Sequence, residues 1–489
     1  MATPLSSRVV AGIGWSAAAT VPSMAAALAA QVALGLLLGK EDFGVYGIAL
    51  GISSFALVIR DGGVRLYLIQ LHPEKVRAGA APALRLAYAW SFGLGLALAG
   101  AAFPLAAAYG EPDMAPVMLV LAASMPLSAY PAVALALVQV EMRFRDLAVV
   151  SLVSALLRYG GAVGFAVMGL GALSMAIPFV VVGAFEVAAG RLYSRFPLTL
   201  VLRRSEGEGR HRWFRATRWS MAGSLAMQLG LQADYVALGL VASTGVVGVY
   251  FFGYQLAIQL GLLTTQVIGR VLIPALAQIR DDRPRAERVF RQAVATTLAV
   301  LGPLAAWLAV SAGDLESLLW HGRWSEAVVP IRVVAATIPF QVVLSMGDWL
   351  LQAWGNFALW TALTLTRGAG LFCAALVAGL LFPTDAERIA LCIGVYLVVS
   401  STILFTVEAR AVGFPMRDLL GGAVIPLVGT AVAALGAAAV LMANLATAPL
   451  LSLLATSAAS ILPAATFYLL CWRKGRLPIS IFRSGAPRK

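Results

Sequence analysis

The sequence predicts an all-α polytopic membrane protein with about fourteen transmembrane helices, and three observations carry this prediction. The chain has 489 residues, of which 60% are hydrophobic and only 12% are charged, whereas soluble domains are about half apolar and about a quarter charged. Apolar stretches near the ~20 residues that a helix needs to cross a bilayer fill most of its length. Lys and Arg gather in alternate loops. This composition excludes an ordinary soluble enzyme and a disordered chain.

The expected helices follow one another with short loops between them. We place them at about 9–38, 43–60, 82–109, 115–140, 147–169, 171–195, 217–241, 246–275, 289–312, 328–354, 357–382, 386–409, 419–442 and 448–472. The loops leave no room for a separate folded soluble domain.

The distribution of Lys and Arg predicts the orientation. With the N-terminus in the cytoplasm, thirty of the 36 basic residues fall on the cytoplasmic side, four fall outside, and Arg158 and Arg367 lie within spans. Cytoplasmic loops carry such an excess in membrane proteins, so both termini are expected inside, in a bacterial inner membrane. The net charge of +13 would also suit a nucleic-acid partner, but the orientation rule accounts for it, and we expect no nucleic acid to bind.

An internal repeat relates the two halves of the chain. A shift of 204 residues superposes the first two helices on the seventh and eighth, and a shift of 213 superposes the fourth on the tenth. The matched residues include Trp15-Ser16 with Trp219-Ser220, Gly44-Val45-Tyr46 with Gly248-Val249-Tyr250, Pro126 with Pro339 and Gln139 with Gln352. Because each copy has an even number of helices, the copies should be related by an axis along the membrane normal, as in transporters whose halves rock against each other.

The repeat also predicts the domains. We expect an N-lobe of helices 1–6 at 1–195, a basic cytoplasmic linker at 196–217, a C-lobe of helices 7–12 at 218–409, two extra helices at 410–473 and a basic cytoplasmic tail at 474–489.

Polar residues form narrow stripes on three of the expected helices. The eighth carries Gln255, Gln259, Gln266 and Arg270; the tenth carries Gln341, Ser345, Asp348, Gln352 and Asn356; the fifth carries Ser151, Ser154 and Arg158. A charge at the centre of a bilayer costs roughly 2.5–3.5 kcal/mol on insertion scales. Such stripes therefore favour a water-filled cavity lined by these residues, and the alternative is hydrogen bonding between helices, worth about 0.6 kcal/mol each.

The charged residues inside the spans leave their individual roles open. Arg158, Arg270 and Arg367 could bind an anionic substrate or pair with carboxylates, the candidates being Asp234, Asp348, Glu186 and Glu408. Arg270 could equally extend to the cytoplasmic face. Asp61, which follows Arg60, could form a local pair or take part in coupling, as could Asp234 and Asp348. Arg65 suits a lipid headgroup as well as a substrate.

Motifs for other chemistry are missing from the sequence. It has no Walker lysine motif and no metal-type spacing of Cys and His, so we expect neither a cofactor nor a metal. Glu41 and Asp42 could be catalytic carboxylates of a membrane glycosyltransferase or polymerase. Such an enzyme would normally need a sizeable outer loop, and the longest one here is short, around 313–327. We interpret Lys40-Glu41-Asp42 as a helix cap instead.

Several motifs together resemble a known family. They are Leu38-Gly39-Lys40-Glu41-Asp42-Phe43-Gly44-Val45-Tyr46, Arg60-Asp61-Gly62-Gly63-Val64, Tyr67-Leu68-Ile69-Gln70 and Gln232-Ala233-Asp234-Tyr235. They are similar to the polysaccharide-transporter branch of the multidrug/oligosaccharidyl-lipid/polysaccharide exporter superfamily, which includes O-antigen and exopolysaccharide flippases. The resemblance covers roughly residues 5–410 and implies two six-helix lobes around a cationic central cavity. Gly62-Gly63 departs from the Leu-Gly or similar step expected there.

The function that this resemblance and the stripes favour is that of a flippase, a transporter rather than an enzyme. The substrate would be an undecaprenyl-diphosphate-linked oligosaccharide, moved from the inner to the outer leaflet for surface polysaccharide biosynthesis such as lipopolysaccharide or exopolysaccharide. The bilayer, a polysaccharide polymerase and glycosyltransferases are the expected partners. The membrane potential, worth about 4.6 kcal/mol per 100 mV for a dianion, or proton coupling could drive it. A multidrug or cation exporter of the same superfamily is the alternative, and it predicts a net acidic cavity.

Overall fold

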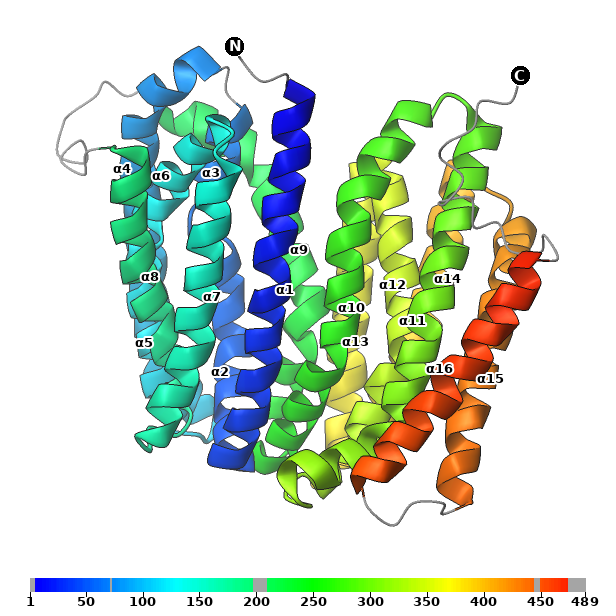
Figure 1. Cartoon of the computed structure of the whole chain (residues 1–489). Helices are drawn as coiled ribbons and strands as arrows, with labels where there is room; N and C mark the ends of the chain where they lie inside the picture. The colour runs from blue at the N-terminus through cyan, green and yellow to red at the C-terminus, as the bar shows by residue number, and fades with distance from the viewer. Residues whose placement is uncertain (1–4, 71–72, 197–208, 444–448, 474–489) are drawn as a thin grey trace. The chain divides into compact units, whose positions relative to one another are not determined.

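The computed structural model describes residues 5–70, 73–196, 209–443 and 449–473. Every regular element in these residues is a helix, as Figure 1 shows, and they contain no strand. The predicted all-α class is confirmed.

The chain divides into two compact units, Met1–Gly248 and Val249–Lys489. The first unit contains α1 (Leu5–Leu37), α2 (Lys40–Val58), α3 (Val64–Gln70), α4 (Pro73–Tyr109), α5 (Met114–Leu127), α6 (Ala129–Val140), α7 (Phe144–Val167), α8 (Leu173–Ser194), α9 (Gly209–Gly239) and the first turn of α10 (Thr244–Ile279). The second contains the rest of α10, α11 (Arg283–Trp320), the short 3-10 helix η2 (Ser325–Ala327), α12 (Val328–Ala353), α13 (Phe357–Leu381), α14 (Ala386–Val412), α15 (Met416–Met442) and α16 (Pro449–Arg473).

The membrane spans agree with the expected helices apart from two details. Twelve described helices are long and apolar enough to cross a membrane, and the pair α5 and α6, bent by 45° at their break, would make a thirteenth. The remaining expected span corresponds to α9, which is not among them because Gln228, Gln232 and Asp234 lower its hydropathy. The short helix α3 was not expected at all.

The helix α9 packs within the first unit. It contacts α2, α3 and α4. A glycine lets α9 approach α2 closely, because a Cβ at Gly51 on α2 would lie 3.2 Å from the Cβ of Tyr235 on α9. The boundary between the compact units falls after α9, in the first turns of α10.

The N-terminus of α2 has the cap that the sequence predicts. The backbone N–H of Gly39 donates to Oδ2 of Asp42 at 2.9 Å. Glu41 and Asp42 both lie in the first turn, where negative charge is stabilised by the helix dipole. The interpretation of Lys40-Glu41-Asp42 as a cap is confirmed.

The internal repeat is visible in one close contact of the first unit. A Cβ on Gly44 would overlap the carbonyl oxygen of Thr244, and a Cβ on Gly248 would overlap the carbonyl oxygen of Lys40. Residues 40 and 44 correspond to 244 and 248 under the shift of 204. The two contacts are therefore the same contact made twice, as a local two-fold relation requires.

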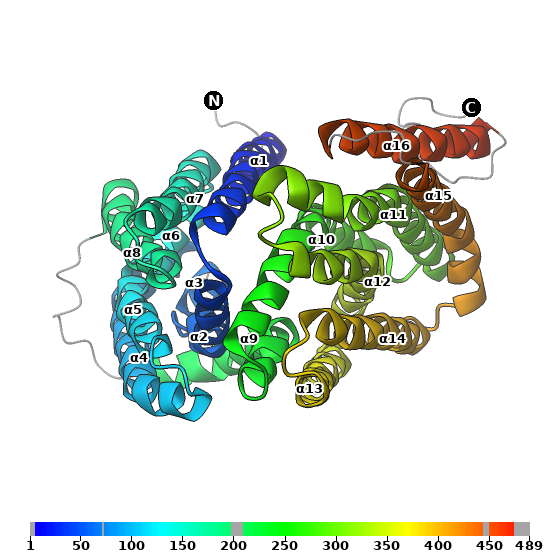
Figure 2. The same cartoon turned by 90° about the horizontal axis from the view of Figure 1, so that it is seen from below.

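Each unit has its own apolar core. In the first unit α3, α4 and α6 enclose Leu68, Leu84 and Tyr130, and in the second α10, α11, α12 and α14 enclose a cluster around Phe290 and Phe405. Seen from below in Figure 2, α15 and α16 lie side by side next to α11, with which both are in contact.

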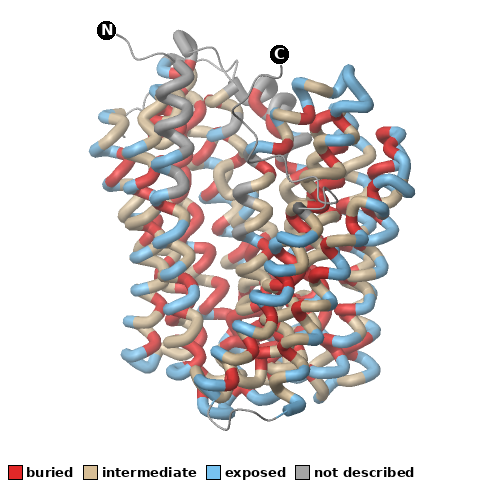
Figure 3. Tube along the Cα trace, turned by 45° about the vertical axis from the view of Figure 1, so that its right-hand side comes forward, coloured by how far each residue is buried: buried red, intermediate tan, exposed pale blue. Residues whose placement is uncertain are grey.

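Large apolar side chains also cover the outer surface, where Figure 3 shows exposed residues along the helices. Leu192 and Leu435, for example, are 71% and 70% exposed. An exposed apolar surface of this extent is expected of a protein surrounded by lipid.

Candidate functional site

The candidate site lies where α2 ends and the chain turns into α3. Gly62 and Gly63 have φ angles of 62° and 70°, a conformation that costs glycine little and other residues more. The N–H of Gly62 donates to the carbonyl oxygen of Ile59 at 2.8 Å, and that of Gly63 donates to Oδ1 of Asp61 at 3.0 Å. Asp61 thus stabilises the turn locally, as aspartates commonly do.

Two tryptophans hold this turn from the other side. The indole N–H of Trp90, on α4, donates to the carbonyl oxygen of Ile59 at 2.7 Å. Trp213, on α9, packs edge-on against Trp90 with ring centroids 6.0 Å apart. A Cβ at Gly62 would come within 2.8 Å of Trp213 and 3.2 Å of Trp90. This crowding explains why glycine stands where the resemblance predicts leucine.

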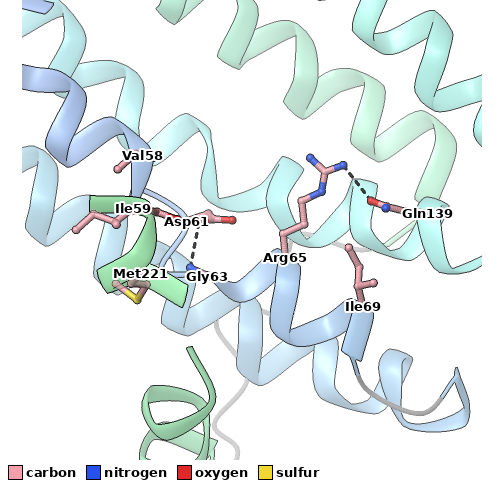
Figure 4. Close-up of a pocket in the computed structure, with 9 residues that line it drawn as sticks. Val58, Ile59, Asp61, Gly63, Arg65, Ile69, Gln139 and Met221 are labelled. Carbon is pink, nitrogen blue, oxygen red and sulfur yellow. Dashed lines mark hydrogen bonds between the residues drawn. The ribbon is translucent and has the colours of Figure 1, made fainter. Parts of the chain in front are cut away.

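Two cavities open beside the turn, with volumes of about 360 Å³ and about 350 Å³. Both are lined by Val58, Asp61 and Arg65. The first also touches Gln139 and the side of α9 at Met221. Figure 4 shows Arg65 extending from α3 toward Gln139 on α6, with Asp61 at the turn. The guanidinium of Arg65 donates to Oε1 of Gln139 at 3.0 Å.

The second cavity gathers the polar face of α7 against α8. Arg60, Ser151 and Glu186 line it. Ser154, one turn along α7, donates to Oε1 of Glu186 at 3.0 Å. Arg158, a further turn on, stacks over the ring of Phe179 on α8 with its guanidinium carbon 4.3 Å from the centroid. The predicted stripe on the fifth helix therefore faces one way, toward α8.

The charges around the cavities are nearly balanced. Burial lowers the pKa of the Arg60 guanidinium, an effect that Glu186 and Asp61 oppose and that Arg158 reinforces. Arginine nevertheless keeps its charge in proteins. Two arginines and two carboxylates thus line the second cavity, and Arg158 adds a third positive charge close by. Arginine forks of this kind bind phosphate oxygens in pairs.

Three of the predicted residues meet elsewhere, in the second unit. Arg367 on α13, Asp348 on α12 and Glu408 on α14 interact electrostatically, and Oε2 of Glu408 lies over the backbone of Gly347. Asp234, by contrast, is buried in α9 and accepts a hydrogen bond from the backbone N–H of Tyr235 at 3.0 Å.

The predicted glutamines give a mixed result. The side-chain amide of Gln341 donates to Oγ1 of Thr337 at 2.9 Å, and its backbone carbonyl oxygen accepts from Oγ of Ser345 at 3.0 Å, so these bonds stay within α12. Three more are partly buried, namely Gln255, Gln259 and Gln352. The side chains of Gln266 and Arg270 lie outside the described residues.

The sequence pattern did not indicate Arg60 or Gln139 as site residues. Arg60 was treated as the partner of Asp61 at a helix end, and Gln139 only as a repeat match. The signal that pointed to them was the Asp-Gly-Gly step, which turns the chain after α2 and directs α3 against α6.

Comparison with known proteins gives the same family at several levels of similarity. Residues 33–329 match the family described as polysaccharide biosynthesis protein. The succinoglycan biosynthesis transport protein ExoT of Rhizobium meliloti (strain 1021) is 24% identical over 323 residues, 65% of this chain. The lipopolysaccharide biosynthesis protein WzxC of Escherichia coli (strain K12) is 23% identical over 339 residues, 67% of this chain. The matches span 64% and 66% of these relatives' own lengths, just under two thirds.

Solved structures share the fold. The lipid II flippase MurJ in an inward closed conformation superposes with a TM-score of 0.74, covering 94% of this chain and 98% of MurJ at 12% identity. An inward-facing multidrug resistance MATE family transporter of the MOP superfamily gives a TM-score of 0.64 at 13% identity, covering 80% of this chain and 94% of the transporter.

Proposed function

This chain belongs to the polysaccharide biosynthesis protein family, and from that premise we propose that it is a flippase for undecaprenyl-diphosphate-linked oligosaccharides. Its relatives include proteins named for transport in succinoglycan biosynthesis and for lipopolysaccharide biosynthesis. The predicted place in the polysaccharide-transporter branch of the superfamily is confirmed.

The arginines at the end of α2 are the observation that supports this proposal best. Arg60 and Arg65 border the same cavity, with Arg158 one step further into α7. A diphosphate offers several anionic oxygens, and Arg is suited to them by its planar fork. The polar groups of Ser151 and Gln139 would remain available for sugar hydroxyls.

The rest of the proposal concerns the path through the membrane. The glycan cannot cross hydrocarbon, whereas the lipid tail can stay in the bilayer throughout. We place both termini in the cytoplasm, which puts the end of α2 on the side where the substrate is made. Alternating access of the lobes at 1–195 and 218–409 would then deliver the glycan to the outer leaflet of a bacterial inner membrane, to a polymerase or transferases there.

The test is flipping by the purified full-length protein in proteoliposomes. A labelled polyprenyl-diphosphate oligosaccharide is added, and its arrival in the opposite leaflet is read by a membrane-impermeant glycosidase. Replacing Arg65 or Arg158 by Ala removes charge-assisted hydrogen bonds worth about 1.5–3 kcal/mol, so binding should weaken by about 10-fold to 100-fold.

Arg77→Ala is the matched control, because Arg77 is an exposed arginine on α4 whose one ion pair among the described residues is with Glu141, at 2.9 Å. It should flip at the unaltered rate. Wild-type protein that does not flip the lipid, or arginine variants that flip it as fast as Arg77→Ala, would refute the proposal. Export of an organic cation from the same liposomes, dependent on Asp61 and Glu186, would point to the multidrug alternative.

A further inference from the structure

The first cavity beside the turn after α2 carries polar groups that a diphosphate leaves unused. Its volume of about 360 Å³ lies between α2, α3, α6 and α9 and is at the small end of the roughly 300–1,000 Å³ of ligand pockets. The polar side chains that line it are Asp61, Arg65, Gln139 and Ser224. Because one of them is a carboxylate, the cavity suits a ligand other than an anion.

Asp61 contributes a hydrogen-bond acceptor to this cavity. Its Oδ1 accepts from the backbone N–H of Gly63 at 3.0 Å, while among the described residues its Oδ2 accepts no hydrogen bond and takes part in no salt bridge. Figure 4 shows the carboxyl group extending from the turn toward the side on which Arg65 lies. An ionised carboxylate can only accept hydrogen bonds, so Oδ2 is matched by a ligand that donates.

Gln139 contributes donors from another wall of the same cavity. Arginine has no acceptor, so the amide atom that faces the guanidinium of Arg65 at 3.0 Å is the oxygen Oε1. The two N–H donors of the amide are then directed away from Arg65, and no described residue accepts from them. The hydroxyl group of Ser224 can donate or accept. The cavity therefore offers an acceptor on one side and donors on another.

A sugar ring combines the groups that this lining matches. Each hydroxyl group both donates and accepts, so neighbouring hydroxyls can donate to Oδ2 of Asp61 and accept from the amide of Gln139. The C–H groups of the ring can pack on the apolar side chains of Ile69 and Met221, which line the same cavity. An ionised phosphate group, by contrast, offers acceptors only, and the negative charge of Asp61 repels it.

The two cavities adjoin, because Asp61 and Arg65 line both of them. We propose that the first cavity binds the sugar that is joined directly to the diphosphate, and that Asp61 selects a neutral sugar there, while the diphosphate lies in the second cavity at Arg60 and Arg65. This inference rests on the proposed function and names its substrate class. A uronic acid in the first cavity would place its carboxylate against that of Asp61, and like charges so juxtaposed reject a ligand.

The test is equilibrium binding of three polyprenyl-diphosphate lipids to the full-length protein in nanodiscs of zwitterionic lipid. The first lipid carries a methyl ester on the diphosphate, the second a neutral hexose, and the third the corresponding uronic acid. The methyl lipid has the same diphosphate charge as the hexose lipid, so their ratio reports the sugar alone. The hexose lipid should bind the wild type about 10-fold to 100-fold more tightly than the methyl lipid, as expected for one charge-assisted hydrogen bond. The uronic acid lipid should bind at least about 10-fold more weakly than the hexose lipid.

Asp61→Asn is the informative variant. The amide oxygen of Asn can still accept from the N–H of Gly63, so the turn keeps its hydrogen bond, whereas the charge is lost and Oδ2 is replaced by a donor. The preference for the hexose lipid over the uronic acid lipid should fall by about 10-fold or more. Glu186→Gln is the matched control, because it removes the same charge from the second cavity and does not line the first. It should keep the wild-type ratio between these two lipids.

The outcomes separate this inference from the proposed function. Wild-type protein that binds the methyl and hexose lipids equally, or the hexose and uronic acid lipids equally, overturns the inference and leaves the diphosphate site standing. A ratio that is unchanged in Asp61→Asn, or changed as much in Glu186→Gln, also overturns the role of Asp61. Wild-type protein that binds none of the three lipids refutes the proposed function and this inference with it. The wild-type comparison needs no variant, so it decides even if Asp61→Asn does not fold.

Discussion

The turn after α2 offers the sharpest test, because one added methyl group should both strain it and crowd it. In Gly62→Ala the residue must keep a φ of 62°, which costs a non-glycine residue roughly 1–2 kcal/mol. The new Cβ would also lie 2.8 Å from the ring of Trp213, and overpacking of this kind typically costs about 1–3 kcal/mol. The variant should therefore lose about 2–5 kcal/mol of unfolding free energy.

Two further glycines separate these contributions. Gly110 has a φ of 68° but nothing within 4 Å of its added Cβ, so Gly110→Ala should show the strain alone, about 1–2 kcal/mol. Gly160 is helical with open space around it, so Gly160→Ala should raise the unfolding free energy by ~0.5–1 kcal/mol.

The assay is reversible unfolding by SDS in mixed micelles, followed by tryptophan fluorescence, to which Trp90 and Trp213 contribute directly. Gly62→Ala should be the least stable of the three variants and should alter the native emission. If it unfolds together with Gly110→Ala, the tryptophans do not confine the turn, and our account of the Gly-Gly step is refuted.

Three other outcomes follow from single contacts. Gly44→Val should destabilise the first unit strongly, because its Cβ has no space at the α2–α10 contact. It should change the unfolding free energy by more than Gly160→Ala does, and a stable variant in the same SDS assay would contradict the repeat contact. Arg77→Ala should change the unfolding free energy by less than ~1 kcal/mol, since its partner Glu141 and it are both solvent-exposed. Desolvation, with a contribution from Asp113, raises the pKa of Glu111, so the folded state holds this proton to higher pH than the unfolded state and stability falls as pH rises through that interval. Glu111→Gln should flatten this fall, and a wild-type stability that rises with pH at equal slope in both proteins would contradict it.

Much of the fold could be predicted from the sequence because a lipid bilayer constrains the length and apolar composition of each helix, which are properties of consecutive residues. Helix length, apolar composition and the cap at Lys40-Glu41-Asp42 are local properties, and the structure confirms them. The repeat could also be recognised in the sequence, because Gly44 and Gly248 occupy equivalent positions under the shift of 204 residues. The short helix α3 was missed because it follows a turn whose shape depends on tryptophans distant in the sequence.

The site was harder to predict, since it depends on which helices meet. The stripe of Ser151, Ser154 and Arg158 was recognised, but nothing local indicated that Glu186 would accept from Ser154. The stripe on the tenth expected helix was interpreted as one surface, whereas the side chain of Gln341 is hydrogen-bonded within its own helix.

The sequence by itself determined the class of molecule, the order of its membrane spans and its family, because hydropathy and motif are carried by neighbouring residues. Only the tertiary structure decided that α9 packs on α2, that Arg60 and Arg65 share a cavity, and that Glu408 lies over Gly347 beside Asp348. Those contacts join helices distant in the chain, and their geometry depends on where a missing Cβ lets two backbones or a carboxyl group come close.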